Sequence, residues 1–170
     1  MRTAVWVVWA VLVQMLVTAI GARLSFFHVL PDAMIVATVF LAWHRSPVQT
    51  ATGALVLGYV FGRQALAPSG LYETALVAMG VLVYVVSDSL MMRGRVFFAL
   101  TSGAAAMAYQ LLVTGLSLVF ADGVGFYGLP TVSLLPCGLL TAALAALCHK
   151  PMLALERRLM PERHQEMLWR

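Results

Sequence analysis

Acidic side chains within apolar sequence are the residues of this chain that could carry chemistry, and Asp88 is the clearest example. It lies in the run Tyr84–Ser89, near the end of an apolar stretch. An ionisable residue in a membrane segment is a candidate functional site by default. A proton relay would need several acids at mid-depth, and the sequence offers none. We therefore interpret Asp88 as pairing with Arg93, about one helical turn away.

Arg63 and Glu73 are a second candidate, on either side of a turn that contains Pro68 and Gly70. One interpretation is an ion pair that fixes two successive helices. The other is that Arg63 extends along the apolar surface to reach lipid headgroups. Together with Asp32, these residues form the expected outer polar surface, which is the predicted partner contact: Asp32, Arg63, Gly70 and Glu73.

Histidines and cysteines show no spacing typical of a metal or catalytic site. HxxxH, HExxH and CxxC patterns are absent from the sequence, as are GxSxG, P-loop and Rossmann glycine patterns. Cys137 and Cys148 would lie about 16 Å apart along a helix, too far for a disulfide. We expect no enzyme activity, no metal and no cofactor, and rank intramembrane hydrolysis as a remote alternative.

The composition indicates whether the chain is surrounded by water or by lipid. Of the 170 residues, 62% are hydrophobic and only 11% are charged, whereas a soluble domain carries about a quarter charged residues. The mean hydropathy is +0.90. The net charge of +4 does not indicate nucleic-acid binding, because the basic residues lie at the ends of apolar stretches and form no patch. A membrane protein is predicted.

The expected fold is all-α, a bundle of six transmembrane helices, each of about 20 residues. We predict a six-span domain over residues 1–149 and a basic cytoplasmic tail over residues 150–170. The six spans are expected at about Ala4–Ala22, Pro31–Trp43, Val48–Leu66, Leu71–Met91, Val96–Phe120 and Thr131–Cys148.

The second span is the irregular one. Pro31 favours a helix start, and Asp32 would then face the positive end of the helix dipole. The run from Ala33 to Trp43 is short for a full crossing, so residues from Leu24 would complete it, partly as a re-entrant piece. Gln14, in the first span, is expected to make a hydrogen bond to a neighbouring helix rather than to serve transport.

The distribution of lysine and arginine predicts the orientation. With a cytoplasmic N-terminus and six spans, only Arg23 and Arg63 fall on the outer side, as the positive-inside rule requires. Four arginines form the expected cytoplasmic basic anchor: Arg93, Arg95, Arg157 and Arg158. Met152, Leu155 and Leu159 share a helical face, which suits a tail helix at the headgroups or docked to a cytoplasmic partner.

Small residues form two seams for helix packing. Gly53, Gly58 and Gly62 lie at helical spacing in the third span, and Gly103 begins a run of alanines in the fifth. Small residues let two helix backbones approach closely in lipid. We favour packing within the chain over homodimerisation. These two helices are expected to make the tightest contact of the bundle.

A resemblance to a known family rests on a few of these residues. Pro31–Asp32 opens an apolar run, Thr52–Gly53 and Gly58 precede Gly70–Leu71, and Glu156–Leu159 closes the chain with basic residues. With its length and six expected spans, the sequence resembles the MreD family, a membrane component of the bacterial rod-shape machinery. In that family an aspartate follows the glycines, whereas Gly62 and Arg63 stand here. This departure marks the place where we expect partner specificity.

The resemblance implies a non-enzymatic scaffold in the bacterial inner membrane, with both termini cytoplasmic. It would bind an MreC-like bitopic protein and, through it, connect MreB filaments to the peptidoglycan glycosyltransferase and transpeptidase of lateral wall synthesis. The MreD fold is similar to the substrate-binding subunits of energy-coupling-factor transporters. The alternative is therefore a capture subunit of a vitamin importer, which would need an outward pocket with convergent polar groups.

Overall fold

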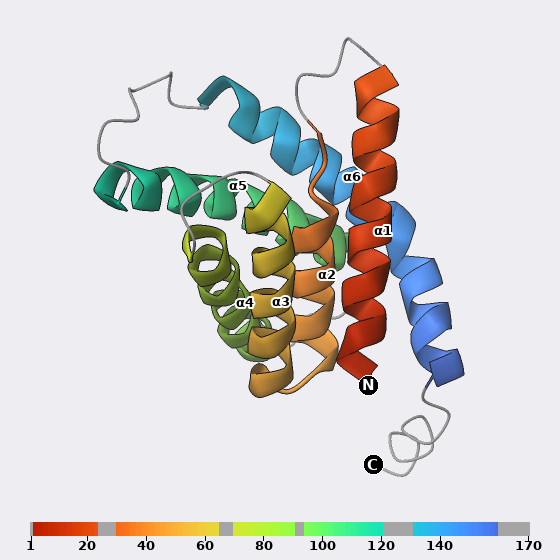
Figure 1. Ribbon diagram of the computed structural model, residues 1–170. Helices are drawn as coiled ribbons and strands as arrows, with labels where there is room; N and C mark the ends of the chain where they lie inside the picture. The colour runs from red at the N-terminus through yellow and green to blue at the C-terminus, as the bar shows by residue number, and fades with distance from the viewer. Residues whose placement is uncertain (1, 24–29, 65–69, 91–93, 121–130, 160–170) are drawn as a thin grey trace.

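A computed structural model describes residues 2–23, 30–64, 70–90, 94–120 and 131–159. These residues form six α-helices and no strand, which confirms the all-helical prediction (Figure 1). The helices are α1 (Arg2–Arg23), α2 (Ala33–His44), α3 (Pro47–Gln64), α4 (Leu71–Leu90), α5 (Arg95–Phe120) and α6 (Thr131–Leu159).

The central element is α2, the shortest helix. Ten consecutive residues, from Ala33 to Ala42, are buried, so no face of this helix is open. The other five helices all pack against it. A helix that is apolar all round belongs in an interior, and the sequence of α2 (AMIVATVFLAWH) has no polar face. Its one internal hydroxyl, on Thr38, donates to the Met34 carbonyl oxygen at 2.9 Å.

The five surrounding helices expose apolar side chains. On α1, Leu12 and Leu16 are about 60% exposed, and Leu100 and Leu139 on α5 and α6 are similar. Two stretches are long and apolar enough to cross a membrane, Arg95–Ser117 and Leu134–Arg158. The apolar stretches of α1, α2 and α4 are shorter. The structure therefore supports two candidate membrane spans among the described residues, and the six crossings remain a prediction.

The closest helix pairs are consecutive in the chain, α5 with α6 and α3 with α4. The expectation that the glycine seams of the third and fifth spans meet each other is wrong. A Cβ atom on Gly103 would lie 2.8 Å from the Gly138 carbonyl oxygen of α6. Moreover, α5 runs across the direction of α1–α3 in Figure 1, so the six helices are not one parallel bundle.

The last helix is longer than expected. The sixth span was expected to end at Cys148, but α6 continues through Pro151 to Leu159. Packing explains the continuation, because Met152 is fully buried and Leu155 lies against the core. The first ten residues of the expected tail, 150–159, are therefore helical, and Met152 packs inward instead of lying at the headgroups. Residues 160–170 lie outside the described residues.

The start of α1 and the end of α6 lie at the same end of the molecule (Figure 1). Aromatic contacts connect this end: the Trp6 and Phe40 rings are 4.5 Å apart, and Phe40 stacks on His44 at 4.2 Å. The opposite end holds the start of α2. Polar contacts between helices lie at both of these ends of α2, around Asp32 at its start and Arg45 after its end.

Candidate functional site

Asp32 caps the start of α2. Its Oδ1 atom accepts hydrogen bonds from the backbone N–H groups of Met34, at 2.9 Å, and Ile35, at 3.2 Å. Asp32 has extended backbone angles, as an N-cap residue does. The sequence placed it in the first turn, and the structure places it one position earlier. Pro31, which has no N–H to satisfy, precedes it.

Two other helices complete the cap. The backbone N–H of Asp32 donates to Thr141 Oγ1 of α6 at 3.1 Å, and that of Ala33 donates to Gln14 Oε1 of α1 at 2.8 Å. All four N–H groups from Asp32 to Ile35 therefore have side-chain acceptors. Non-helical backbone at membrane depth is tolerated only where protein covers it and satisfies it. The expected interhelical hydrogen bond of Gln14 is confirmed.

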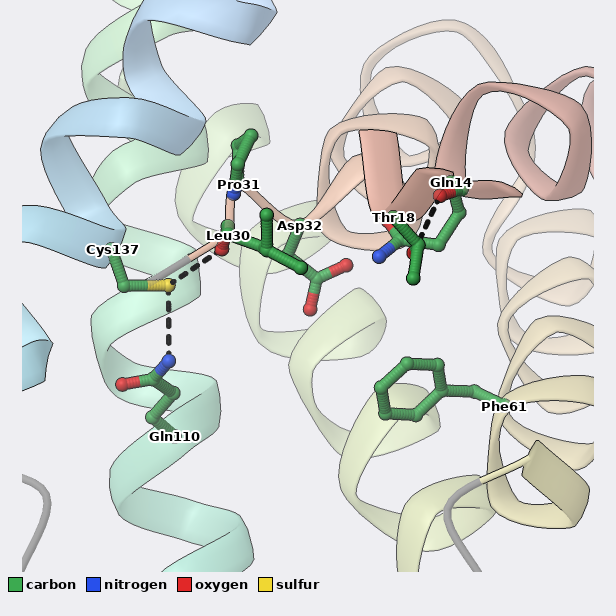
Figure 2. A pocket seen from close by; sticks show the side chains of 8 residues that line it. All are labelled: Gln14, Thr18, Leu30, Pro31, Asp32, Phe61, Gln110 and Cys137. Atoms are coloured by element: carbon green, nitrogen blue, oxygen red, sulfur yellow. Dashed lines mark hydrogen bonds between the residues drawn. The ribbon is translucent and has the colours of Figure 1, made fainter. Parts of the chain in front are cut away.

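A cavity of about 370 Å³ opens beside this cap (Figure 2). It lies between α1, α3, α5 and α6, and Figure 2 shows the Asp32 carboxylate pointing into it, with Phe61 opposite. Its lining residues are Gln14, Thr18, Leu30, Pro31, Asp32, Phe61, Gln110 and Cys137. On the far wall, Gln110 Nε2 donates to Cys137 Sγ at 3.0 Å. This cavity is the candidate binding site.

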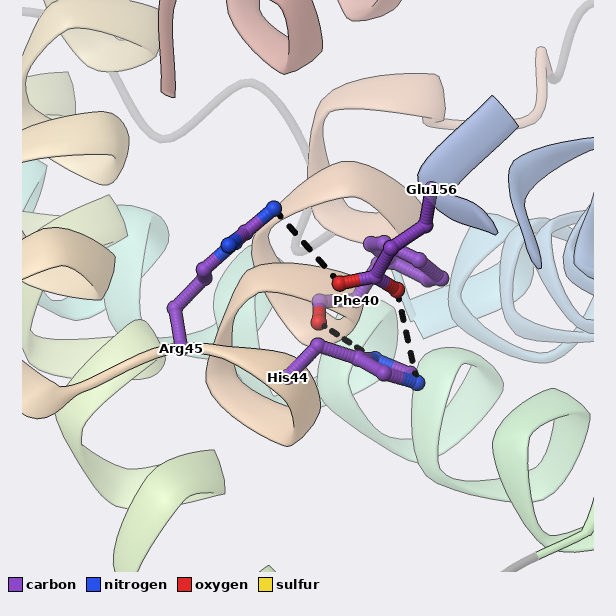
Figure 3. Close-up of polar contacts among 4 residues, drawn as sticks. All are labelled: Phe40, His44, Arg45 and Glu156. Atoms are coloured by element: carbon purple, nitrogen blue, oxygen red, sulfur yellow. Dashed lines mark hydrogen bonds and ion pairs between the residues drawn. The ribbon is translucent and has the colours of Figure 1, made fainter. Parts of the chain in front are cut away.

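The other end of α2 carries an ionic cluster (Figure 3). Arg45 Nη2 lies 3.5 Å from Glu156 Oε1, and His44 Nε2 lies 3.9 Å from Glu156 Oε2. The Arg45 side chain is only 6% exposed and that of Glu156 15%. This cluster fastens the end of α6 to the α2–α3 turn. No sequence pattern predicts this ion pair, because 111 positions separate Arg45 from Glu156 in the chain.

Arg63 and Glu73 do not form an ion pair, which was one of the two interpretations of these residues. Arg63 is exposed on α3, where its Nη2 donates to Tyr59 Oη at 2.9 Å and its guanidinium lies 5.2 Å from that ring's centroid. Glu73 Oε2 accepts the Gly70 N–H at 3.0 Å. Each group thus has a local partner that is nearer in sequence. Gly70 has a positive φ of 94°, a conformation that favours glycine.

The glycines of α3 pack within the chain, as favoured from the sequence. A Cβ atom on Gly58 would lie 2.7 Å from the Glu73 Cα atom of α4, so only glycine fits there. At Gly62 the nearest atoms are Glu73 carboxylate oxygens at 3.6 and 3.7 Å, which is ordinary contact distance. Gly53 is buried in α3. The seam therefore joins α3 to α4.

The basic anchor residues are placed only in part. Arg95 Nε donates to the Ala146 carbonyl oxygen at 2.9 Å, which ties α5 to α6. Arg157 and Arg158 are exposed in the last turn of α6. Arg93 lies outside the described residues, and so does the Asp88 side chain, so the expected pair of Asp88 and Arg93 remains a prediction.

Replacing Thr141 with valine is expected to lower the free energy of unfolding by about 1–2 kcal/mol, because it leaves the Asp32 N–H buried without its acceptor. Gln14→Met should act similarly on the Ala33 N–H. Thr52→Val is the matched control, since the exposed Thr52 hydroxyl only bonds its own helix, to the Val48 carbonyl oxygen. Unfolding midpoints in detergent would measure the difference, and equal midpoints for Thr141→Val and Thr52→Val would contradict this assignment.

Comparisons with known proteins give no identity for this site. No family model, no curated protein and no solved structure matches the chain. The function must therefore be inferred from the residues themselves.

Proposed function

We propose that this chain is a multi-pass scaffold of the bacterial inner membrane, with cytoplasmic termini, in a rod-shape (elongation) complex. One observation carries the scaffold role. The polar side chains at both ends of α2 hold helices of this chain together, whereas the outer faces of five helices expose apolar side chains. Soluble monomers rarely expose large apolar patches. This distribution favours a protein that works through contacts inside a membrane.

The particular complex rests on the resemblance to the MreD family. The family-like residues Gly58 and Gly70–Leu71 lie at the junction of α3 and α4, where Gly58 allows the two backbones to touch. This junction would present Arg63, exposed on its outer side, to the membrane helix of an MreC-like bitopic protein. Through that protein the scaffold would support lateral peptidoglycan synthesis and connect indirectly to MreB filaments.

The importer subunit remains a second candidate, because one observation favours it. A cavity of about 370 Å³ with polar groups on its wall falls within the size range of small-molecule sites. An importer subunit would use it for a vitamin, and its partner would be an ATPase module.

Both termini are expected to be cytoplasmic. The start of α1 and the end of α6 share one end of the molecule, as an even number of crossings requires (Figure 1). A green fluorescent protein fused after Arg170 should fluoresce, and alkaline phosphatase fused there should be inactive. Active phosphatase at that position would contradict the proposed topology.

Depletion of the chain in its native bacterium tests the proposed function. The scaffold role predicts that rods become round and that labelling of new lateral peptidoglycan falls, with growth unaffected by added vitamins. Re-expression of the wild type should restore the rods, and Gly115→Ala, whose added Cβ atom would meet nothing within 4 Å, is the matched variant that should restore them equally. Rods that persist, together with a requirement for one vitamin, would contradict the scaffold and favour the importer.

A further inference from the structure

We propose that the cavity beside the start of α2 binds a primary ammonium group, carried either by a lipid headgroup or by a small free amine. The proposal does not depend on the scaffold role. It rests on three features of the cavity wall: the Oδ2 atom of Asp32, which has no partner among the described residues, the free amide nitrogen of Gln14 and the exposed position of Thr18 at the opening.

The site is not suited to an anion, although helix N-termini commonly bind anions through free N–H groups. Here the N–H groups of Asp32, Ala33, Met34 and Ile35 all have protein acceptors. In addition, the Asp32 carboxylate occupies the positive end of the helix dipole. An entering phosphate or carboxylate would find no N–H donor from these four residues and would meet a like charge.

The described residues provide no cation beside the Asp32 carboxyl group. Oδ1 of Asp32 accepts both capping hydrogen bonds, and Oδ2 has no hydrogen-bond partner among the described residues. Among those residues, the ion pairs involve Glu156 and not Asp32. The two capping hydrogen bonds satisfy Oδ1 and leave Oδ2 without a donor from the described residues. A ligand ammonium in the cavity would supply that donor together with a positive charge.

The neighbouring groups define the rest of the ligand. Gln14 Oε1 is held by the Ala33 N–H, so the orientation of the amide is fixed. Its Nε2 atom has no protein acceptor in the described part of the chain and lies on the side of the Asp32 carboxylate in Figure 2. The site thus offers an acceptor for the ammonium and a donor for an adjacent ligand oxygen. Phe61 adds an aromatic wall, a side chain that attracts cations.

The opening favours an amphiphile. Thr18 lines the cavity and is exposed. On α1, Met15 lies three residues before it on the same side of the helix and is 54% exposed. An acyl chain could lie along these side chains while the ammonium occupies the cavity. A primary ammonium is specified because Asp32 Oδ2 requires an N–H donor, which a trimethylammonium group lacks.

Native mass spectrometry of the full-length chain in detergent tests the proposal. Phosphatidylethanolamine and phosphatidylcholine with the same acyl chains are the probes, and 2-aminoethanol is tested separately by its effect on the unfolding midpoint. We expect phosphatidylethanolamine to bind at least tenfold more tightly than phosphatidylcholine if the source is a lipid. A rise in the midpoint with 2-aminoethanol and no lipid preference would assign a free amine. The absence of both effects would overturn the proposal.

Asp32→Asn is the decisive variant, because asparagine caps helices as well as aspartate but carries no charge. It should weaken binding of the preferred probe at least tenfold, whereas Glu73→Gln, a carboxylate change outside the cavity lining, should leave binding unchanged. Unchanged binding by Asp32→Asn would overturn the proposal. If that variant does not fold, Thr18→Trp decides, since it narrows the opening from an exposed position and should also abolish binding.

Discussion

Gly58→Ala is expected to lower the free energy of unfolding by about 2–3 kcal/mol, although it adds a single methyl group. The new Cβ atom would lie 2.7 Å from Glu73 Cα, 2.9 Å from the Tyr72 carbonyl oxygen and 3.0 Å from Glu73 N. All three are backbone atoms of α4, so no side-chain rotation can relieve the contact. The two helices must separate, which loses packing along the α3–α4 interface.

Gly62→Ala is the matched control one turn further along the same helix. Its Cβ atom would have no neighbour nearer than 3.6 Å, and alanine favours a helix over glycine by about 1 kcal/mol. We therefore expect this variant to be as stable as the wild type or more stable. Unfolding by sodium dodecyl sulfate in mixed micelles would measure the stability of both variants, Gly58→Ala and Gly62→Ala. Equal losses for the two variants would contradict the assigned packing.

Glu156→Ala is expected to lower the free energy of unfolding by about 3 kcal/mol. Arg45 has a 6% exposed side chain, and the substitution removes the carboxylate 3.5 Å from its guanidinium. Removing one partner of a buried pair leaves a costly charge, whereas an exposed pair would contribute under about 1 kcal/mol. The end of α6 should loosen first, and trypsin cleavage after Arg157 or Arg158 would report it.

The double variant Arg45→Glu with Glu156→Arg tests whether the loss of stability comes from the lost pairing of these two residues. It should recover a measurable part of the loss, because opposite charges again face each other across the same gap. Arg157→Ala is the control, since Arg157 is exposed on the same turn. Losses that are additive in the exchanged chain would show that the two residues do not interact.

The helix starts were the part of the fold most readable from the sequence. Proline, glycine and charge clusters mark them, and the expected starts of the third to sixth helices fall within one residue of Pro47, Leu71, Arg95 and Thr131. These signals are local, so they act whatever the tertiary structure. The late end of α6 differs because the apolar run was expected to end at Cys148, whereas the burial of Met152 continues the helix to Leu159.

The arrangement of the helices was less readable. The sequence directed attention to the α3 glycines, but the chain is organised around α2. One signal was present, since α2 is apolar on every face and a helix of that kind is interior. The length of α2, 12 residues, also fits an interior helix, because it is too short to cross a membrane alone.

Of the residues that line the cavity, the sequence singled out Asp32, as part of an outer polar surface, and Gln14, as a residue that bonds a neighbouring helix; the cavity itself was not predicted. Thr141 accepts a hydrogen bond from the N–H group of Asp32, which is 109 residues away in the chain, and no sequence periodicity connects the two residues. Conversely, Arg63 and Glu73 have opposite charges at a turn, which suggested a pair, yet Tyr59 and Gly70 are closer partners in the chain. Long-range polar contacts depend on how helices cross, and the sequence alone does not specify the crossing of α5 over α1–α3.

Purification of the intact chain from native membranes in mild detergent tests the central claim most directly. The scaffold role predicts that a bitopic protein with a large periplasmic domain co-purifies in fixed ratio. Gly115→Ala, whose Cβ atom would meet nothing within 4 Å, should retain this partner, and Gly58→Ala should lose it as the α3–α4 junction opens. Recovery of an ATPase module with a bound vitamin, and no bitopic protein, would contradict the account.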